Sequence, residues 1–386
     1  MTAQIFTGAA VFDGTRLMHG ASLRIEDGLV TDPGPGEVVQ LEGGILAPGF
    51  LDLQVNGAGG RMVDGTCTAD MLAEMCAIHA GLGATGILPT LITDTSEATA
   101  RVIEAGIEAA RRQTPGFLGL HLEGPHLDPR RKGAHDPALI RPMTGADLAC
   151  LLDAAARLPS LMVTLAPEST TPEQIARLSG AGVIVSLGHT DCTHAQATAA
   201  IAAGATCVTH LFNAMSQLGN REPGLVGAAL TQPVHAGLIA DGIHVSPEAI
   251  RIAMAASGRL FVVSDAMAAA GSDATEFPLN GRRILRRDGR LTLEDGTLAG
   301  ADLTLPQAVS ILIRFGTPWE TALAMATSRP ATCLGRQNQL GHLLPGRQAD
   351  MVHLGLDGSL GGVWQSGRPL LKLRRPVNCD LAGAFR

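Results

Sequence analysis

The chain has few aromatic residues and no excess of basic ones. Of its 386 residues 3% are aromatic, with two Trp and no Tyr, which disfavours single-strand binding by base stacking and an aromatic belt at a membrane interface. Lys and Arg number 29 against 36 Asp and Glu, giving a net charge of −7. Because an acidic chain is repelled by nucleic acid and by anionic lipid, we expect neither as a partner.

Cysteine is also sparse, and it follows no pattern. The seven cysteines are scattered and form no CxxC pair, which argues against a disulfide framework and against a thiolate zinc site. The opening segment, MTAQIFTGAAVFDGTR, lacks the basic and apolar blocks of a signal peptide. Hydrophobic residues make up 46% of the chain, enough to bury a large core. We expect a globular, cytoplasmic protein.

Short apolar runs alternate with Ala-rich helical stretches over residues 47–342, a pattern typical of parallel strands joined by crossover helices. Eight such runs predict a closed (β/α)₈ TIM-type barrel, an α/β fold. The runs are GFLDLQVN (49–56), TGILPTLIT (85–93), LGLHLEGP (118–125), LMVTLAPE (161–168), VIVSLGHT (183–190), CVTHLFNAM (207–215), VHAGLIADG (234–242) and LFVVSDAM (260–267).

The two ends of the chain differ from this middle. Residues 1–46 and 343–386 contain short strand-like runs separated by turn residues, so we expect them to form one small β-sandwich domain together. A β-hairpin insertion is predicted over residues 277–296, after the eighth run, from two turn signals that end in Gly281 and Gly289. Its arginines are expected to form a solvated face rather than an anion site.

Polar side chains stand at the ends of the predicted barrel strands. Glu123, His189 and His210 end the third, fifth and sixth runs, His244 follows the seventh, and Asp265 ends the eighth. The carboxyl ends of barrel strands converge on one face, where TIM-barrel enzymes have their active sites. Each of these residues alone is compatible with a structural role. Together they predict a metal site, because buried charges need a partner.

One carboxylate and two imidazoles suit a divalent ion with an open coordination position, most readily Zn²⁺, with Fe²⁺ as the alternative. Such an ion activates water for the hydrolysis of an amide or ester, and we expect Asp265 to act as the general base and then the general acid. His121 and His126 flank Glu123 and are candidates to support the ligands. The remaining histidines, His79 among them, are expected to be structural.

An ordered set of motifs resembles the N-acetylglucosamine-6-phosphate deacetylases of the amidohydrolase superfamily. The resemblance covers the chain from Pro48 to Thr304, and THLFNAM followed by REPGL is its most specific part. The motifs are PGFLDLQVNGAGG, HLEGPH, KGAH, GHT, THLFNAM, NREPGL, ADGIHV, SDAM and TLAGADLT.

The resemblance implies roles for individual residues. Glu123, His189 and His210 match the metal ligands, and Asp265 matches the general acid/base. His135 or His244 would polarise the acetyl carbonyl. Arg221 would meet the sugar 6-phosphate. In similar enzymes this arginine can come from the neighbouring subunit, which implies a homodimer. The other residues at substrate-contacting positions are Ala134, Asn213, Ala214, His244, Leu298, Ala299 and Gly300.

The sequence departs from the wider superfamily at the end of the first barrel strand. Many amidohydrolases have His-x-His there for a second metal, whereas this chain has Gln54 and Asn56. Amides are weak zinc ligands, so we expect one metal ion per subunit, with Gln54 hydrogen-bonded to water at that ion. The expected reaction is deacetylation of N-acetyl-D-glucosamine 6-phosphate. The alternatives are the galactosamine epimer, an unphosphorylated substrate, and a sugar-phosphate-binding protein without catalysis.

Overall fold

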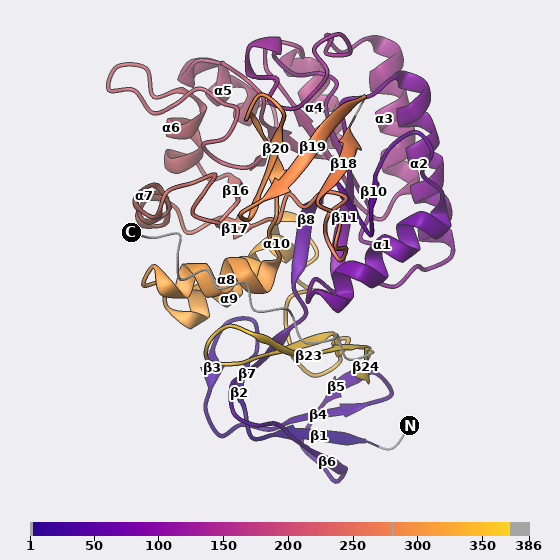
Figure 1. Cartoon of the computed structure of the whole chain (residues 1–386), viewed down its shortest axis with the longest axis vertical. Coiled ribbons are helices and arrows are strands. Elements are labelled where there is room, and N and C mark those ends of the chain that lie inside the picture. The colour runs from indigo at the N-terminus through magenta and orange to yellow at the C-terminus, as the bar shows by residue number, and fades with distance from the viewer. Residues whose placement is uncertain (1–2, 280, 371–386) are drawn as a thin grey trace.

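A computed structural model describes residues 3–279 and 281–370 of the chain. In Figure 1 a barrel surrounded by helices occupies the upper part of the molecule, and a small β domain lies below it. This arrangement confirms the expected α/β barrel with a second domain built from both chain ends. Among the described residues, no helix combines the length and the apolar character that crossing a membrane requires.

Eight parallel strands form the barrel, and each lies within one of the eight predicted runs. Their order in the sheet follows the sequence from β8 to β17. A bridge between Val55 and Ala266 joins the last strand region to the first, so that the sheet closes on itself. The strands are β8 (Leu51–Val55), β11 (Gly86–Ile92), β12 (Leu120–Glu123), β13 (Leu161–Leu165), β14 (Ile184–Leu187), β15 (Cys207–Val208), β16 (His235–Leu238) and β17 (Leu260–Val262).

Helices cover the outside of the barrel and begin at well-formed caps. The side chains of Thr144, Thr171 and Thr193 each accept a hydrogen bond from the backbone N–H three residues on. The side chain of that later residue accepts in turn from the backbone N–H of the threonine. The helices are α1 (Ala69–Gly81), α2 (Ser96–Arg111), α3 (Gly145–Arg157), α4 (Pro172–Gly180), α5 (His194–Ala202), α6 (Gly224–Thr231), α7 (Pro247–Ala256), α8 (Leu305–Arg314), α9 (Trp319–Ala326) and α10 (Ser328–Cys333), with a 3₁₀ turn η1 (Pro129–Arg131).

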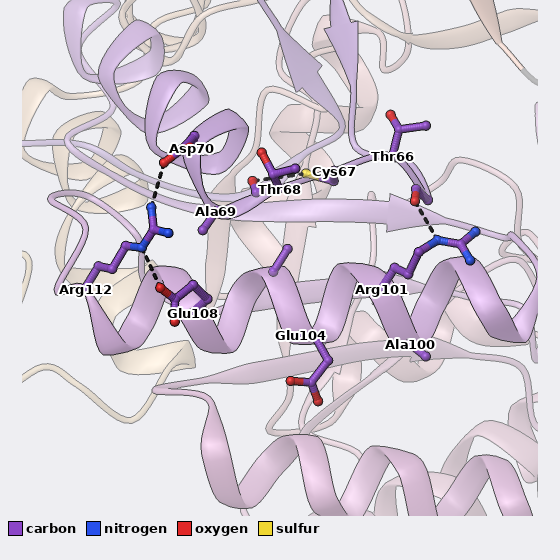
Figure 2. Close-up of a pocket in the computed structure, with 12 residues that line it drawn as sticks. Thr66, Cys67, Thr68, Ala69, Asp70, Ala100, Arg101, Glu104, Glu108 and Arg112 are labelled. Carbon is purple, nitrogen blue, oxygen red and sulfur yellow. Dashed lines mark hydrogen bonds and ion pairs between the residues drawn. The ribbon is translucent and has the colours of Figure 1, made fainter.

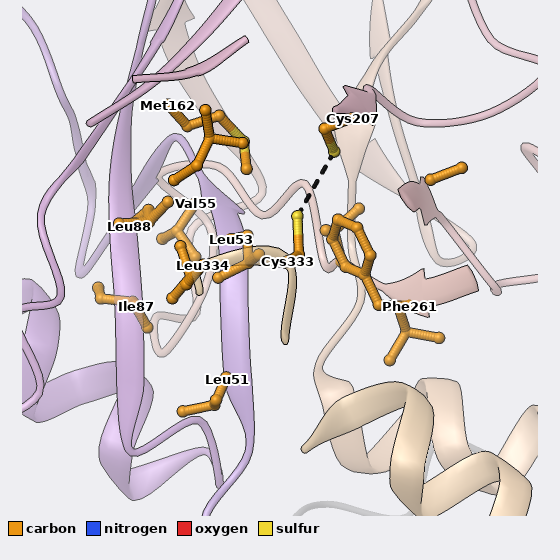
Figure 3. Close-up of a cluster of buried hydrophobic side chains, with 14 of the residues drawn as sticks. Leu51, Leu53, Val55, Ile87, Leu88, Met162, Cys207, Phe261, Cys333 and Leu334 are labelled. Carbon is orange, nitrogen blue, oxygen red and sulfur yellow. Dashed lines mark hydrogen bonds between the residues drawn. The ribbon is translucent and has the colours of Figure 1, made fainter. Parts of the chain in front are cut away.

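The lower part of the barrel interior is apolar. Leu53, Leu88 and Phe261 belong to this core, and Leu334 of the segment after α10 packs among the same side chains (Figure 3). Two cysteines belong to this core, with Cys333 Sγ 3.7 Å from Cys207 Sγ as a thiol contact rather than a disulfide. Every cysteine in the described part of the chain is free, in keeping with the scattered spacing of the cysteines.

The β domain consists of two sheets that share a core of Phe6, Ile25, Leu46, Met351 and their neighbours. One sheet has the order β5-β4-β1-β6, and the other has the order β24-β23-β22-β7-β2-β3. The strands are β1 (Gln4–Thr7), β2 (Ala10–Phe12), β3 (Leu17–Met18), β4 (Leu23–Glu26), β5 (Leu29–Thr31), β6 (Glu37–Gln40), β7 (Ile45–Pro48), β22 (Met351–Leu354), β23 (Leu360–Gln365) and β24 (Arg368–Pro369). A two-stranded ribbon of β9 (Gly57–Ala58) and β10 (Arg61–Met62) lies at the barrel mouth.

The predicted domain boundaries stay a prediction. The boundary at residue 46 falls inside β7, whose four residues all pair with β22. The second boundary, at residue 343, precedes β22, and the end of the expected segment, residues 371–386, lies outside the described residues.

The insertion after the eighth barrel strand is larger than the predicted hairpin. It forms a four-stranded antiparallel sheet of β18 (Glu276–Leu279), β19 (Arg282–Arg287), β20 (Arg290–Leu293) and β21 (Leu298–Ala301), which lies across the front of the barrel in Figure 1. Its arginines are not a uniform solvated face. Arg283 is exposed between Glu276 and Glu294, whereas Arg286 is half-buried and pairs with Asp302. The guanidinium of Arg282 donates to the carbonyl of Ala134.

Candidate metal centre and active site

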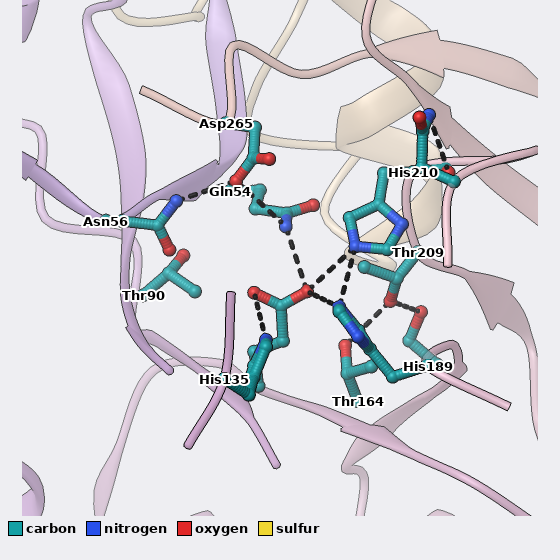
Figure 4. A network of polar contacts seen from close by, with 12 residues as sticks. Gln54, Asn56, Thr90, His135, Thr164, His189, Thr209, His210 and Asp265 are labelled. Carbon is teal, nitrogen blue, oxygen red and sulfur yellow. Dashed lines mark hydrogen bonds and ion pairs between the residues drawn. The ribbon is translucent and has the colours of Figure 1, made fainter. Parts of the chain in front are cut away.

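Glu123, His189 and His210 meet at the carboxyl-terminal end of the barrel, as the sequence predicts. Figure 4 shows the rings of His189 and His210 next to each other in this cluster. Glu123 Oε1 lies 3.2 Å from His189 Nε2 and 3.1 Å from His210 Nε2, and the two nitrogens are 3.0 Å apart. All three residues are at most 4% exposed. Three ligand atoms from three different strands therefore converge on one point.

The protonation of His189 indicates that this point suits a cation. Its Nδ1 lies 2.8 Å from the carbonyl oxygen of Arg131, which can only accept, so Nδ1 carries the proton. In the neutral ring the Nε2 lone pair then faces both the Glu123 carboxylate and His210 Nε2. Such a cluster of lone pairs is repulsive unless a positive charge lies among them, and a divalent metal supplies it. The donor set therefore fits the expected ion.

The protonation of each residue in this cluster depends on its neighbours. Burial alone would raise the pKa of Glu123, but His189 and His210 outweigh burial when their rings also carry a proton on Nε2, and they hold that pKa well below its usual value. A divalent ion would take the place of these Nε2 protons. Burial would lower the pKa of His210, and the Glu123 carboxylate reverses this effect and raises it. Glu123 is therefore a carboxylate at neutral pH, as a metal ligand must be.

Three of the functional side chains stand on backbone in the left-handed region. The φ angles are +47° at His189, +28° at His210 and +50° at Asp265, a conformation that side chains with a Cβ seldom adopt. Each residue follows its strand by two or three positions, where the chain turns sharply toward the next helix. These turns direct the side chains into the barrel mouth, and such strain is typical of functional sites.

Asp265 lies beside the cluster and is held by two amides. Asn56 Nδ2 donates to its Oδ1 over 2.6 Å, and Gln54 Nε2 lies 3.2 Å from the same oxygen. Gln54 Nε2 also contacts Glu123 Oε1 at 3.1 Å. Burial, with the nearby Glu123 charge, raises the pKa of Asp265 to about 6. A carboxyl group with this pKa can both accept and release a proton near neutral pH.

A second buried carboxylate, Asp52, supports Asp265 from behind. Its Oδ1 accepts hydrogen bonds from the backbone N–H of Ser264 over 3.1 Å and of Gln54 over 3.3 Å. Burial raises the pKa of Asp52 to about 7. Asp52 thus joins β8 to the turn that carries Asp265. The sequence analysis missed this residue, although a lone Asp within the apolar run GFLDLQVN was a usable signal.

His135 faces the metal cluster with a defined tautomer. The backbone N–H of Thr93 donates to its Nδ1 over 3.2 Å, so Nδ1 lacks a proton and Nε2 carries it. That Nε2 lies 4.0 Å from Glu123 Oε2. Burial, together with the neighbouring imidazoles, holds the pKa of His135 well below its usual value, so the ring is a neutral donor. Thr93, which sets this tautomer, was also missed by the sequence analysis.

His244 is held by its own loop after β16. Asp241 accepts from the backbone N–H groups of Ile243 and His244, each over 2.8 Å, and its Oδ2 lies 2.6 Å from His244 Nδ1. The Nε2 atom of His244 is thereby left for another partner. An electrostatic interaction with His244 acts to lower the pKa of Asp265, which places the two residues in one site.

The insertion contributes Leu298, Ala299 and Gly300 at the edge of the site. The N–H of Ala301, the next residue, donates to the carbonyl of Asp265 over 2.9 Å. A Cβ on Gly300 would lie 2.8 Å from that same carbonyl, so only glycine permits the close approach. Ala134 packs against the core of the same sheet. The sheet therefore covers the side of the site formed by residues 133–135.

The segment after His210 contains the other predicted substrate contacts. Asn213 is half-buried, and its side-chain amide donates to the carbonyls of His210 and Leu211 over 3.3 Å. Ala214 accepts from Thr190 through its carbonyl. Arg221 is exposed farther along the loop, and among the described residues its side chain makes no hydrogen bond or ion pair.

A separate groove of about 560 Å³ lies between the start of α1 and the side of α2 (Figure 2). Its charged residues already have protein partners. Arg112 pairs with Asp70 and Glu108, and Arg101 donates to the carbonyl of Gly65. Nothing in this groove points to catalysis.

A barrel with a carboxylate–imidazole cluster and an adjacent aspartate of raised pKa at its mouth defines the class of metal-dependent hydrolases. A model of the Amidohydrolase family matches residues 45–371. The chain belongs to the amidohydrolase family, within its group of N-acetylglucosamine-6-phosphate deacetylases. The expected family is thereby confirmed.

Individual relatives match almost the whole chain. The N-acetylgalactosamine-6-phosphate deacetylase of Shewanella sp. (strain ANA-3) is 39% identical, covering 95% of both chains. The N-acetylglucosamine-6-phosphate deacetylase of Haemophilus influenzae is 34% identical, covering 82% of this chain and 84% of that one. The solved deacetylase of Pasteurella multocida has a TM-score of 0.91 at 32% identity, covering 95% of this chain and 99% of that one.

Proposed function

We propose that the chain hydrolyses N-acetyl-D-glucosamine 6-phosphate to D-glucosamine 6-phosphate and acetate. The convergence of Glu123, His189 and His210 beside Asp265 carries the proposal. Relatives named for this substrate match over most of their length. A structure of the Mycobacterium smegmatis enzyme, an aspartate-to-alanine mutant in complex with this sugar phosphate, has a TM-score of 0.89 at 32% identity, covering 96% of this chain and 99% of that one.

Glu123, His189 and His210 would hold one divalent ion per subunit, for which Zn²⁺ is our first choice and Fe²⁺ the second. Such an ion supplies Lewis acidity, which lowers the pKa of bound water to about 7 and polarises a carbonyl oxygen. Gln54 and Asn56 give their amide N–H groups to Glu123 and Asp265, an arrangement that supports one ion rather than two.

Asp265 acts as the general base and then as the general acid in this proposal. The amides of Gln54 and Asn56 bind its Oδ1, so Oδ2 is the oxygen available to take a proton from the attacking water. The same oxygen then returns the proton to the nitrogen of the departing amino sugar. A pKa of about 6 suits both steps, because neither the acid nor the base form is then scarce near neutral pH.

His135 and His244 are the two candidates to donate a hydrogen bond to the acetyl carbonyl. His135 offers Nε2–H beside Glu123, and His244 has its Nε2 atom free while Asp241 binds its Nδ1. The carbonyl donor should affect kcat most when it is removed, because its hydrogen bond strengthens as negative charge develops on that oxygen. His135→Asn and His244→Asn, compared for kcat and KM, identify it.

The remaining contacts recognise the sugar phosphate. Ala134, Asn213, Ala214 and the segment Leu298–Gly300 surround the mouth of the site, and Arg221 binds the phosphate of a neighbouring subunit's substrate in a homodimer. The exposure of Arg221, and the absence of a side-chain partner for it within the described part of its own chain, support this arrangement. We also propose a cytoplasmic location, which suits the free cysteines.

The galactosamine epimer is the second candidate substrate. It is favoured by the 39% identity to the Shewanella enzyme and by 35% identity to an Escherichia coli O157:H7 enzyme of the same name. The deciding experiment measures acetate release from both epimers, each with and without the 6-phosphate. We expect the glucosamine phosphate to give the highest kcat/KM. A higher kcat/KM for the galactosamine phosphate would assign that substrate instead. Binding of both sugar phosphates without turnover of either would overturn the proposal.

A further inference from the structure

A line of buried polar side chains crosses the barrel directly beneath the metal cluster. It consists of His121 on β12, Thr164 on β13, Ser186 on β14 and Thr209 after β15, none more than 4% exposed (Figure 4 shows the threonines). Thr164 Oγ1 lies 2.7 Å from His121 Nε2 and 2.7 Å from Thr209 Oγ1, and Ser186 Oγ lies 2.6 Å from Thr209 Oγ1. Apolar residues would fill this layer without any need for hydrogen bonds, so the polar line needs an explanation.

The hydrogen bonds in this line can run in only one direction. His121 Nδ1 lies 3.1 Å from the carbonyl of Leu53, an acceptor only, so Nδ1 carries the ring proton. With that proton on Nδ1, the Nε2 atom of the neutral imidazole is a hydrogen-bond acceptor.

The order of the hydroxyl donors follows from that tautomer. The Thr164 hydroxyl must donate to His121 Nε2, and its oxygen then accepts from Thr209. The Thr209 oxygen in turn accepts from Ser186. Each hydroxyl has one proton, so replacing any member leaves a neighbour without its partner.

Each metal ligand is close in the chain to a member of this line. His121 precedes Glu123 by two residues, Thr209 directly precedes His210, and Ser186 precedes His189 by three. Thr164 has no ligand on its own strand, but its backbone pairs with Glu123 and its carbonyl accepts from Gly124 over 3.1 Å. The line therefore ties together the three strands whose ends present the ligands.

We propose that His121, Thr164, Thr209 and Ser186 form a positioning network that fixes the spacing of Glu123, His189 and His210 for a divalent ion. This inference rests on the proposed function only in taking those three residues as metal ligands. Thr164 is the informative member, because it is neither a ligand nor a sequence neighbour of one. Supporting hydrogen bonds around metal ligands typically change metal affinity by about 10-fold to 100-fold.

The test compares Zn²⁺ affinity among variants of the full chain, measured by competition with a chromogenic chelator. Thr164→Val keeps the shape and removes the hydroxyl, and we expect it to weaken Zn²⁺ binding by about 10-fold or more. Thr164→Ser restores the hydroxyl and should bind Zn²⁺ nearly as the wild type does. Thr327→Val is the matched control, because Thr327 is fully buried and its hydroxyl donates to the carbonyl of Leu323 at the end of α9, outside the hydrogen bonds of the network. It should reduce stability and leave Zn²⁺ affinity unchanged.

Equal Zn²⁺ affinity in Thr164→Val and the wild type would overturn the network. If Thr164→Val does not fold, Ser186→Ala, at the end of the line, replaces it in the test. We expect Ser186→Ala to bind Zn²⁺ several-fold more weakly than the wild type, and an unchanged Zn²⁺ affinity would contradict the network. These outcomes are independent of the substrate. A wild type that binds Zn²⁺ but releases acetate from neither sugar phosphate would overturn the proposed function and leave this inference standing.

Discussion

At the scale of single residues, Asp265 combines burial, two amide donors and a left-handed backbone. We expect Asp265→Asn to lower kcat by about 10²-fold to 10⁴-fold, the usual contribution of a general acid–base, because an amide cannot exchange the proton. Metal content should stay at the wild-type level. Steady-state kinetics with metal analysis of the same sample measure both.

Ser264, which directly precedes Asp265, provides the control for this experiment. Ser264→Thr keeps the hydroxyl that accepts from the N–H of Ala266 and should retain nearly full activity. An active Asp265→Asn enzyme with its metal intact would exclude Asp265 as the proton carrier.

His79 is a buried histidine that we expect, from its sequence context, to have a structural role. Its Nε2 lies 3.1 Å from the carbonyl of Gly57, and burial lowers its pKa from 6.5 to about 4. Between pH 6.5 and 4, His79 is therefore protonated in the unfolded chain but not in the folded chain. This contribution to stability is present above pH 6.5 and is lost as the pH falls toward 4.

The change His79→Gln should flatten the dependence of unfolding free energy on pH in that window. Urea titrations at several pH values measure the slope, and His19→Gln, at an exposed site, should leave it as in the wild type. An unchanged slope in His79→Gln would contradict the assignment.

At the scale of elements, Gly188 shows how tightly the strand ends are packed around the metal cluster. A Cβ at this position would lie 2.9 Å from the Cβ of Thr209 and 3.0 Å from Cγ2 of Thr164. We expect Gly188→Ala to reduce the unfolding free energy by about 1–3 kcal/mol, the usual cost of overpacking. Gly180→Ala, at the end of α4 with open space around it, should be neutral or slightly stabilising. Denaturant unfolding of both variants, after a chelator has removed any bound metal, measures the difference in unfolding free energy.

The elements themselves were largely predictable. All eight apolar runs contain a barrel strand, because buried parallel strands need continuous apolar sequence and the helices between them need caps. The four-stranded insertion was underestimated because the prediction used the turns at Gly281 and Gly289 and not the equivalent Asp295-Gly296 turn, which leads into β21.

The backbone groups that support the site were harder to predict than the ligands. Glu123, His189 and His210 stand out as polar residues at strand ends. The carbonyl of Arg131 and the N–H of Thr93, which set the tautomers of His189 and His135, are backbone groups that every residue has. Their role depends on three-dimensional proximity alone, and no residue type identifies it. Left-handed φ angles at non-glycine residues are hidden from the sequence for the same reason.

At the scale of the whole molecule, metal binding should contribute to folding stability, because the ligands come together only in the closed barrel. Removal of the ion by a chelator should lower the Tm, and added Zn²⁺ should restore it. An ion at a hundred times its Kd stabilises the folded state by about 2.7 kcal/mol. Glu123→Gln should show no such response to Zn²⁺ in differential scanning calorimetry. An identical Zn²⁺ response in Glu123→Gln and the wild type would place the ion elsewhere.

The proposed homodimer makes a complementation test possible. Arg221→Ala and Asp265→Asn should each be nearly inactive on the sugar phosphate. If Arg221 acts in the neighbouring subunit, a mixed dimer contains one intact site, so equal mixing should restore about one quarter of wild-type activity. Activity assays after subunit exchange measure this recovery. No recovery in verified mixed dimers would mean that Arg221 serves its own subunit.

The split β domain also constrains the order of events during synthesis. Strand β7 leaves the ribosome early, but it pairs on one side with β22, which is made some three hundred residues later. Until that late segment emerges, the backbone groups of Ile45–Pro48 on this edge lack their final partners. Premature termination before Met351 would therefore yield a polypeptide with an exposed, apolar β edge, the kind of surface that recruits other chains into aggregates.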